Sequence, residues 1–378
     1  MTKQTLSRRS FSTLIAASAA YAAVGQREVR GSWRRFRNAT PAAGNIVRLS
    51  SNENPYGPSA AALKAMTDGF SLAWRYPDEH ADLLLEELAR INGVPAEQIL
   101  LGDGSGEILK LSAAAFTNKD KKIVVANPTF EAIARHASVA RAEVVKVDLS
   151  PNYSHDLPKM VAAANDPANG AGLVYICNPN NPTASITPKN ELSDFLTKLS
   201  PATTVLVDEA YHHYVESSDY ESVIPLVKQY PNLIVARTFS KIYGMAGLRC
   251  GYCVTQRANI ERMRAQQTWD SVNIMALVAA LASLKDAEQV TRGRKLNSEV
   301  KKSVCTELDA LGYRYIPSHA NFMMIDLRRD VRPIFSALRT RGVEVGRLFP
   351  PLPNFLRVTI GTAAEMKTFL SIFKEVMV

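Results

Sequence analysis

Short apolar runs and helical stretches alternate along the chain from about residue 75 onward. Residues 81–93, ADLLLEELARING, place leucines on one helical face and end at a glycine, which predicts an amphipathic helix. Five later runs of strand length are rich in valine and isoleucine: 121–126, 142–149, 172–177, 203–208 and 232–237. Their spacing of roughly 20–30 residues is typical of repeated strand–helix–strand units around a buried parallel sheet.

The pattern changes after Trp269. A long helical stretch leads into helical periodicity over 295–310, and short strands then surround a helix near Pro333–Arg341. We therefore expect an α/β protein with a large domain over 75–270 and a smaller α+β domain over 271–378. The Pro- and Asn-rich segment that begins near Asn45, taken as 45–74, is expected to pack with the small domain.

Composition agrees with a folded two-domain chain. The 378 residues are 46% hydrophobic and 21% charged, which excludes general disorder. The net charge of +9 would suit nucleic acid, but much of it lies near the N-terminus, and no nucleic-acid-binding module follows. These early cations are Lys3, Arg8, Arg9, Arg27, Arg30, Arg34, Arg35 and Arg37. We therefore predict no nucleic-acid partner.

The N-terminus resembles an export signal. Arg8 and Arg9 precede a short apolar stretch that ends near Ala20–Ala22, where small residues permit cleavage. The stretch is too short for a membrane span of ~20 residues, so no stable membrane anchor is expected. We predict a twin-arginine signal over 1–22, a linker over 23–44 and a periplasmic location. The alternative is a basic tail on a cytoplasmic protein.

The cysteines predict neither disulfides nor a metal site. Cys250 and Cys253 form a C-x-x-C pair within an expected strand, where positions three apart point to opposite faces. Cys177 and Cys305 are distant from them in sequence, and no metal-ligand spacing is present. We expect buried thiols and no bound metal.

Polar motifs follow three of the predicted strands where each strand ends. The NPNNPT motif of residues 178–183 follows the third run. Asp208 and Tyr211 close the fourth run, and Ser240 and Lys241 follow the fifth. Because ligands of open parallel sheets bind beyond the carboxyl ends of the strands, we expect an amide, an acid, a phenol and a lysine in one cleft.

These groups match the chemical demands of pyridoxal phosphate. A desolvated lysine amine is a natural Schiff-base nucleophile for the aldehyde, and an acid can keep the pyridine nitrogen protonated. Residues 102–107, GDGSGE, open an apolar helix, and Arg249 follows Lys241 closely. A helix N-terminus with a cation binds phosphate. The sequence therefore predicts pyridoxal phosphate as the cofactor.

Together the motifs resemble those of the fold-type-I, class I/II pyridoxal-phosphate-dependent aminotransferases, most closely the histidinol-phosphate aminotransferase family. They are SNENPYGPS (51–59), GDGSGE (102–107), NPTF (127–130), NPNNPT (178–183), VDEAY (207–211), TFSKIYGMAGLRCGY (238–252) and LRVTIGT (356–362). The resemblance implies an aspartate-aminotransferase-like fold, with a mostly parallel seven-stranded sheet between helices and a smaller C-terminal α+β domain. It also implies a transaminase with a small-molecule amino donor and a 2-oxo acid acceptor, acting as a homodimer.

The resemblance assigns catalytic roles to residues of this chain. Lys241 would form the Schiff base and then move the proton of the reacting carbon. Asp208 would pair with the pyridine nitrogen, and Tyr211 and Asn181 would hydrogen-bond the cofactor's phenolic oxygen. Phe130 would stack on the ring.

The resemblance also assigns binding roles. The cofactor phosphate would lie in a cup made by the turn at Gly104, Ser105 and Gly106, with Ser240 and Arg249. Tyr56 would reach the cofactor phosphate of the neighbouring subunit, and Arg357 would clamp the substrate carboxylate, which Asn181 also helps to bind.

Three positions depart from the family pattern. Gly106 replaces an Asn or Asp of the cup, and Ala184 stands where glycine usually follows the N-P-T motif. The arginine that holds the substrate phosphate usually follows the G-V-x-V strand directly, but here Gly346 has that place and Arg347 comes next. In a strand, a one-residue shift reverses the face. Arg347 would therefore either reach the substrate through a bulge or point away.

The substrate consequently stays open between an amino-alcohol phosphate and an aromatic or other amino acid. Two other classes compete, a pyridoxal-phosphate-dependent lyase, decarboxylase or racemase and a non-catalytic protein that binds the cofactor. Arg357 favours transamination, because it would hold a carboxylate in place. The presence of Lys241 disfavours a non-catalytic protein.

Overall fold

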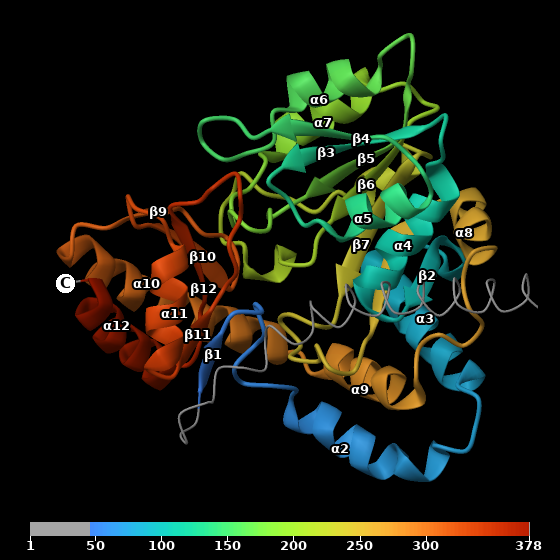
Figure 1. Cartoon of the computed structure of the whole chain (residues 1–378). Coiled ribbons are helices and arrows are strands. Elements are labelled where there is room, and N and C mark those ends of the chain that lie inside the picture. Colours follow the sequence, from blue (N-terminus) through green and yellow to red (C-terminus); the bar gives the residue numbers. More distant parts are fainter. Residues whose placement is uncertain (1–45, 378) are drawn as a thin grey trace, which may run out of the picture. The chain divides into compact units, whose positions relative to one another are not determined.

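The computed structural model describes residues 46–377, so the predicted signal over 1–22 and the linker over 23–44 lie outside the described residues. A seven-stranded sheet forms the centre of the large domain (Figure 1). Its spatial order is β2 (Ile99–Gly102), β8 (Gly251–Thr255), β7 (Leu233–Thr238), β6 (Thr204–Asp208), β5 (Ala171–Cys177), β3 (Lys122–Asn127) and β4 (Val144–Asp148). Within this sheet only β8 runs antiparallel to its neighbours. The predicted mostly parallel, seven-stranded sheet is thus confirmed.

Helices cover both faces of this sheet. One face carries α4 (Gly104–Phe116), α5 (Ala132–Val139) and α8 (Arg257–Arg264), and the other carries α3 (Asp78–Asn92), α6 (Leu157–Ala164) and α7 (Lys189–Lys198). Alternate strand residues feed the two cores: Leu173 packs with the α4 side and Val174 with the α6 side. The inner strands β5 and β6 are buried on both faces, which explains their continuous runs of branched apolar residues.

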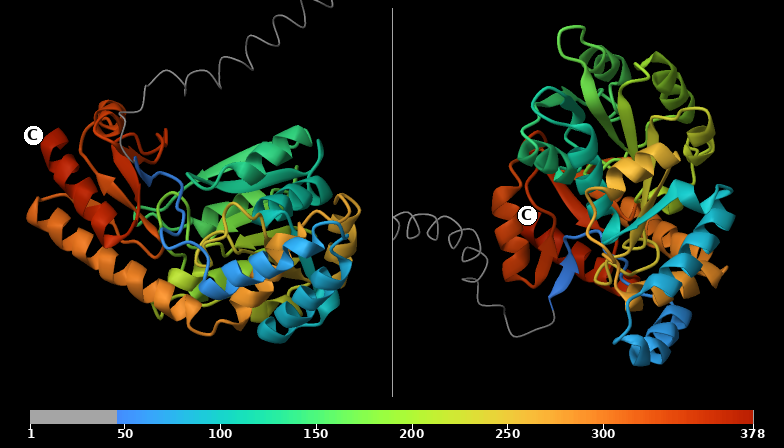
Figure 2. Two further views of the ribbon diagram at one scale, coloured as in Figure 1. Left: turned by 90° about the horizontal axis from the view of Figure 1, so that it is seen from below. Right: turned by 90° about the vertical axis from the view of Figure 1, so that its right-hand side faces the viewer.

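The small domain contains the C-terminal strands and three helices. β12 (Phe355–Thr359), β10 (Phe322–Asp326) and β9 (Arg314–Ile316) form an antiparallel sheet. β1 (Val47–Leu49) pairs in parallel with β11 (Val343–Val345), and Figure 2 shows this early strand beside the C-terminal ones in both views. The helices are α10 (Gln289–Ala310), α11 (Arg332–Thr340) and α12 (Ala363–Met377).

Two helices flank the junction between the domains. α9 (Ile274–Lys285) packs against α2 (Ala60–Gly69) and α3, and its Leu277 belongs to the core of the large sheet. The core of the large sheet therefore includes α9, and the core of the small domain begins within α10. Short 3-10 helices complete the structure at Phe70–Leu72, Ala96–Gln98, His212–Tyr214 and Ile224–Lys228.

The cysteines lie where the strand pattern puts them. Cys250 packs on one side of the large sheet and Cys253 on the other, and both are free thiols. Cys177 is buried as expected, whereas Cys305 on α10 is only partly buried. Over residues 46–377 there is no cluster of side chains suited to a metal ion. Over the same residues, the helices are too short or too polar to cross a bilayer.

Candidate active site

Asp208 ends β6 at the carboxyl edge of the large sheet and is almost fully buried. Its carboxylate accepts hydrogen bonds from the Tyr175 hydroxyl at 2.9 Å and from the Ala210 amide at 3.1 Å. Burial raises the pKa of Asp208 to about 6, although these hydrogen bonds and Lys241 oppose the shift. The fold therefore holds a buried acid whose pKa stays above its ordinary value despite the nearby Lys241.

Lys241 follows β7, and its amine is near enough to Asp208 for their charges to interact. The amine donates to the backbone carbonyl of Asn52 at 3.1 Å, and it lies 5.4 Å from the centre of the Tyr211 ring. Burial, aided by the charge of the nearby Arg357, lowers the pKa of Lys241 to about 8. A substantial fraction of the amine is therefore neutral near physiological pH, as a nucleophile requires.

The start of α4 forms a cradle together with Arg249. Gly104 has a φ of +70°, and a Cβ on this residue would lie only 2.1 Å from the Arg249 guanidinium. A Cβ on Gly251 would lie 2.3 Å from the Ser105 amide. The Arg249 guanidinium also reaches the Ser240 hydroxyl at 3.4 Å. The glycines thus permit a cation and a hydroxyl to converge on a helix N-terminus.

A wider space remains at Gly106, where a Cβ would have Arg249 as its neighbour at 3.8 Å. Gly106 therefore leaves open the space that the expected Asn or Asp would fill, and no other described residue occupies it. At Ala184 the backbone is left-handed, with φ 58°, and the side chain is fully buried. This is the conformation that favours the expected glycine.

Arg357 on β12 brings the small domain to the same site. Its guanidinium donates to the Asn181 side chain at 2.8 Å and to the Ser50 carbonyl at 2.6 Å. Its Nε is buried and has no hydrogen-bond partner in the described chain. Burial lowers the pKa of Arg357 to about 10. A buried guanidinium with an unused donor is suited to an anionic ligand.

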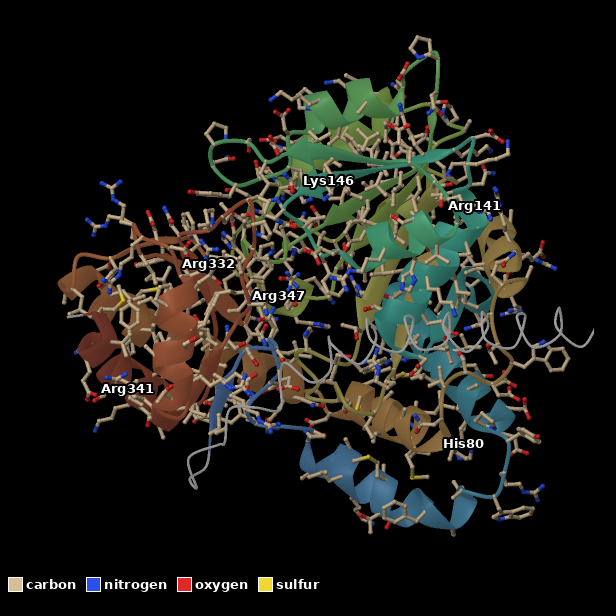
Figure 3. All side chains as sticks on the ribbon, viewed as in Figure 1. His80, Arg141, Lys146, Arg332, Arg341 and Arg347 are labelled. Carbon is tan, nitrogen blue, oxygen red and sulfur yellow. The ribbon has the colours of Figure 1, made fainter. Side chains whose placement is uncertain are left out.

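Arg347 extends from the small domain toward the large one, as Figure 3 shows. It forms an ion pair with Glu131 at 3.1 Å, and its guanidinium lies 4.5 Å from the Phe349 ring centre. The Arg357 guanidinium lies 5.1 Å from the same ring. Because β11 ends at Val345, strand alternation does not fix the direction of Arg347. Both guanidinium groups thus lie close to the same aromatic ring.

Gly346 itself cannot easily carry a side chain. A Cβ there would lie 2.8 Å from the Arg357 carbonyl oxygen and 3.0 Å from both its Cβ and its Nε. The Gly346 amide also donates to that carbonyl at 2.9 Å. The departure from the family pattern therefore follows from the close approach of these two segments.

Phe130 and Tyr56 are predicted site residues that lie apart from this hydrogen-bonded cluster. Phe130 is 39% exposed and stands directly before Glu131, the partner of Arg347. Tyr56 is 44% exposed. Both rings are thus free to cover a ligand, or in the case of Tyr56 to reach another molecule.

Three buried polar groups of the site were not predicted from the sequence. Tyr175 bonds to Asp208, and Asn52 donates to the Tyr211 hydroxyl at 3.1 Å. Next to Asp208, Glu209 forms a buried ion pair with Arg237 at 2.8 Å and ties β6 to β7. Asn52 and Glu209 belong to the SNENPYGPS and VDEAY motifs, so the available signal was their place within those motifs.

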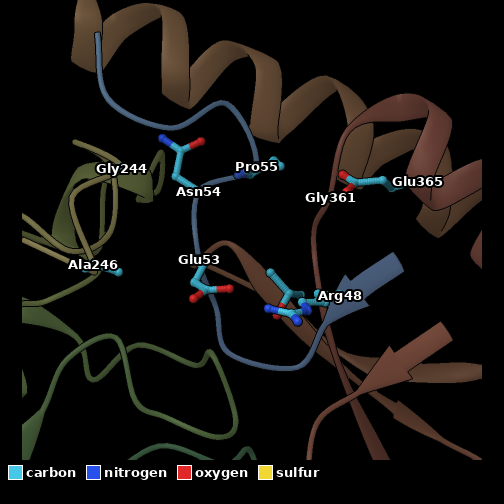
Figure 4. Close-up of a pocket in the computed structure, with 10 residues that line it drawn as sticks. Arg48, Glu53, Asn54, Pro55, Gly244, Ala246, Gly361 and Glu365 are labelled. Carbon is cyan, nitrogen blue, oxygen red and sulfur yellow. The ribbon is translucent and has the colours of Figure 1, made fainter. Parts of the chain in front are cut away.

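A pocket of about 320 Å³ lies between the loop after Lys241 and the small domain, and residues 53–55 form part of its lining (Figure 4). Arg48, Glu53 and Glu365 are among the side chains that line it. Its lining contains none of the residues predicted to bind cofactor or substrate.

The cluster fits the cofactor that the sequence predicts. The cradle of α4 with Ser240 and Arg249 suits a phosphate, and Lys241 suits an aldehyde. Asp208 supplies a buried acid for the pyridine nitrogen. The unpartnered Arg357 Nε offers a donor to the anionic end of a substrate.

Comparison with known proteins agrees with this chemistry. Residues 44–373 match the family model "Aminotransferase class I and II". The chain is 40% identical over 336 residues to the histidinol-phosphate aminotransferase of Moorella thermoacetica, covering 88% of this chain and 86% of that one.

Solved structures give the same picture. The histidinol-phosphate aminotransferase of Sinorhizobium meliloti in complex with pyridoxal-5'-phosphate superposes with a TM-score of 0.82 at 26% identity, covering 88% of this chain and 91% of that one. A double mutant of Thermus thermophilus aspartate aminotransferase has a TM-score of 0.76 at 21% identity, covering 91% and 98%. The latter likeness is one of fold, and it agrees with the predicted aspartate-aminotransferase-like architecture.

Proposed function

The chain belongs to the class I and II aminotransferases and is a pyridoxal-phosphate-dependent transaminase, and from this premise we propose that its amino donor is histidinol phosphate or a close amino-alcohol phosphate. When bound, pyridoxal phosphate supplies an electron sink for the carbanion at the donor carbon. The residues of the chain bind and orient both molecules and move the proton.

In this proposal the Lys241 amine would hold the cofactor and would carry the proton of the reacting carbon. Its lowered pKa supports that role, because the amine can be neutral when it must accept a proton. Asp208 would keep the ring nitrogen protonated, and Tyr211 and Asn181 would hydrogen-bond the phenolic oxygen. Phe130 covers the ring.

The observation that carries the substrate assignment is the pair of guanidinium groups beside Phe349. Arg347 and Arg357 lie 4.5 and 5.1 Å from that ring, and Arg357 keeps a buried donor unused. Two cations suit a dianionic phosphate better than a single carboxylate. The Glu131 carboxylate forms an ion pair with Arg347 at 3.1 Å, so a substrate phosphate would have to displace this carboxylate.

The test is a single-turnover comparison of histidinol phosphate, histidinol and a panel of amino acids. The loaded enzyme is mixed with each donor, and the decay of its visible absorbance gives the rate. We expect histidinol phosphate to react fastest. Arg347→Ala should lower the ratio of its rate to that of histidinol at least tenfold, about the contribution of one charge-assisted contact. Arg341→Ala, which alters an exposed arginine of the same domain, is the matched control. Lys241→Ala should abolish both absorbance and turnover.

A second candidate, an aminotransferase for aromatic or other amino acids, is supported by the ion pair that already satisfies Arg347. Reaction with unphosphorylated amino acids alone would favour it and refute the phosphate assignment. Release of carbon dioxide without an oxo-acid product would instead indicate a decarboxylase.

We further propose a homodimer with shared sites. Leu63, Phe70, Trp74 and Tyr76 are exposed along the segment that follows Tyr56, and clustered exposed apolar residues are typical of an interface. If Tyr56 serves the neighbouring site, mixing inactive Lys241→Ala chains with impaired Tyr56→Ala chains should restore part of the activity. Sedimentation at the mass of a monomer would refute the proposal.

The twin arginines support export, which we also propose. Changing Arg8 and Arg9 together to lysine should abolish export, and fractionation of cells into periplasm and cytoplasm measures it. If the wild type and the double lysine variant were both found in the cytoplasm alone, export of this chain would be refuted.

A further inference from the structure

Asn52 contacts both domains, bonding to Tyr211 in the large one and to Thr359 in the small one. It is only 1% exposed, and its backbone has a positive φ of 54°, which asparagine tolerates better than most residues. Its carbonyl accepts from Lys241 at 3.1 Å and from Asn321 at 3.0 Å. The residue is therefore held in place from the small domain and from the cofactor lysine.

The orientation of the Asn52 amide follows from its contact with Thr359. The Thr359 hydroxyl accepts from the Asn52 backbone N–H at 2.9 Å, and its own hydrogen is directed to the Asn52 Oδ1 at 3.3 Å. With Oδ1 turned to Thr359, the NH₂ group of the side chain faces the Tyr211 oxygen at 3.1 Å. The network thus makes Asn52 a donor to Tyr211.

This donation determines what Tyr211 can do. A phenol has one hydrogen, and its oxygen already accepts from Asn52. Burial raises the pKa of Tyr211, so the phenol keeps that hydrogen. The hydrogen is consequently available to a second acceptor on the side of the ring away from Asn52. In the proposed function this acceptor is the phenolic oxygen of the cofactor.

We propose that Asn52 is a positioning residue that turns Tyr211 into a one-way hydrogen-bond donor toward the cofactor's phenolic oxygen. The inference rests on the proposed place of Tyr211 beside that oxygen. Thr359 lies two residues from Arg357 on β12. The contacts that orient Tyr211 through Asn52 therefore come from the strand that also carries the substrate-binding arginine.

The test follows the pH titration of visible absorbance in the loaded enzyme without substrate. A hydroxyl that donates to the cofactor's phenolic oxygen stabilises the negative charge of that oxygen. Loss of this donor should therefore raise the pH at the midpoint of the absorbance titration. We expect Tyr211→Phe to raise the midpoint by about one unit, the size of one hydrogen bond. Asn52→Gly, which tolerates the positive φ, should raise it by about half a unit or more.

The double variant decides whether Asn52 acts through Tyr211. We expect Asn52→Gly with Tyr211→Phe to titrate like Tyr211→Phe alone, because the two changes remove one shared function. Asn321→Ala is the matched control: it removes another support of the same segment but leaves the Asn52–Tyr211 contact, so its midpoint should match the wild type. The other groups near Tyr211, namely Lys241, Arg357, Asp208 and Cys177, are unchanged in all variants.

Three results would overturn the inference: a wild-type midpoint in Asn52→Gly, an equal shift in Asn321→Ala, or fully additive shifts in the double variant. An unchanged midpoint in Tyr211→Phe would overturn it as well, together with the placement of Tyr211. Because the titration uses no amino donor, these failures are distinct from failure of the substrate proposal, which is measured by turnover.

Discussion

Replacing Asp208 by asparagine tests two effects of the buried carboxylate. One is its cost to the stability of the cofactor-free fold, and the other is its contribution to cofactor binding. In the cofactor-free protein the carboxylate is buried at the end of β6, and burial raises its pKa to about 6 from an ordinary 3.8. The folded state therefore binds more protons than the unfolded state between these values. As a result, the carboxylate lowers the stability of the cofactor-free fold as pH rises through this window, and its full cost applies above pH 6.

The magnitude follows from the size of the shift. About two pKa units correspond to about 3 kcal/mol at pH 8, and to about half of that at pH 5. With an unfolding entropy of about 2.1 cal/mol/K per residue, 3 kcal/mol over the described chain amounts to a change of about 4 °C in Tm. Asp208→Asn should thus stabilise the cofactor-free protein by about 4 °C at pH 8 and by about 2 °C at pH 5.

The same change should weaken cofactor binding by roughly 100-fold, because the partner of the ring nitrogen is lost. Calorimetric Tm values of cofactor-free and loaded protein at both pH values, with a cofactor titration, measure the two effects. Asp82→Asn, which alters an exposed residue of α3, is the control. The reasoning would be refuted by a pH-independent gain in Tm, or by wild-type cofactor affinity in Asp208→Asn.

Three further changes test other parts of the site. Ala184→Gly should stabilise the protein by about 1 kcal/mol, since Ala184 holds a φ of 58° that glycine adopts without strain; an unchanged or lower Tm would contradict this. Gly346→Ala should raise the KM of the amino donor about tenfold, roughly the cost of one lost charged contact, because the new Cβ would lie 2.8 Å from the Arg357 oxygen; wild-type steady-state kinetics would show that the backbone adapts freely. Glu131→Gln should release Arg347 and lower the KM of a phosphorylated donor by up to about fivefold at low salt, the range of an exposed ion pair; a higher KM would mean that the pair with Glu131 helps to position Arg347.

Much of the large domain could be predicted because its signal is local. Buried parallel strands require continuous branched apolar residues, so β5 and β6 stand out in the sequence. Since ligands gather at the carboxyl ends of such strands, the positions of Asp208 and Lys241 at two strand ends are enough to place both in one cleft.

The remainder depended on contacts that no local pattern carries. α9 is apolar enough to pack on either domain, and its contacts with α2 and α3 determine which core it joins. The left-handed backbone of Asn52 is fixed by partners such as Thr359, far away in sequence. The direction of Arg347 depends on Glu131, in the other domain.

The path of residues 47–54 also has a consequence for biosynthesis. β1 pairs with β11, and Asn52 bonds to Thr359 across a sequence separation of 307 residues. Every strand of the large sheet, together with Lys241, has been synthesised by Thr255, but the surroundings of Lys241 are completed only when β12 has emerged. Such a late, non-local closure is slow compared with helix formation. A translation product that stops before Phe355 therefore has the whole sheet and the catalytic lysine, yet lacks the anchor of Asn52 and the arginine on β12.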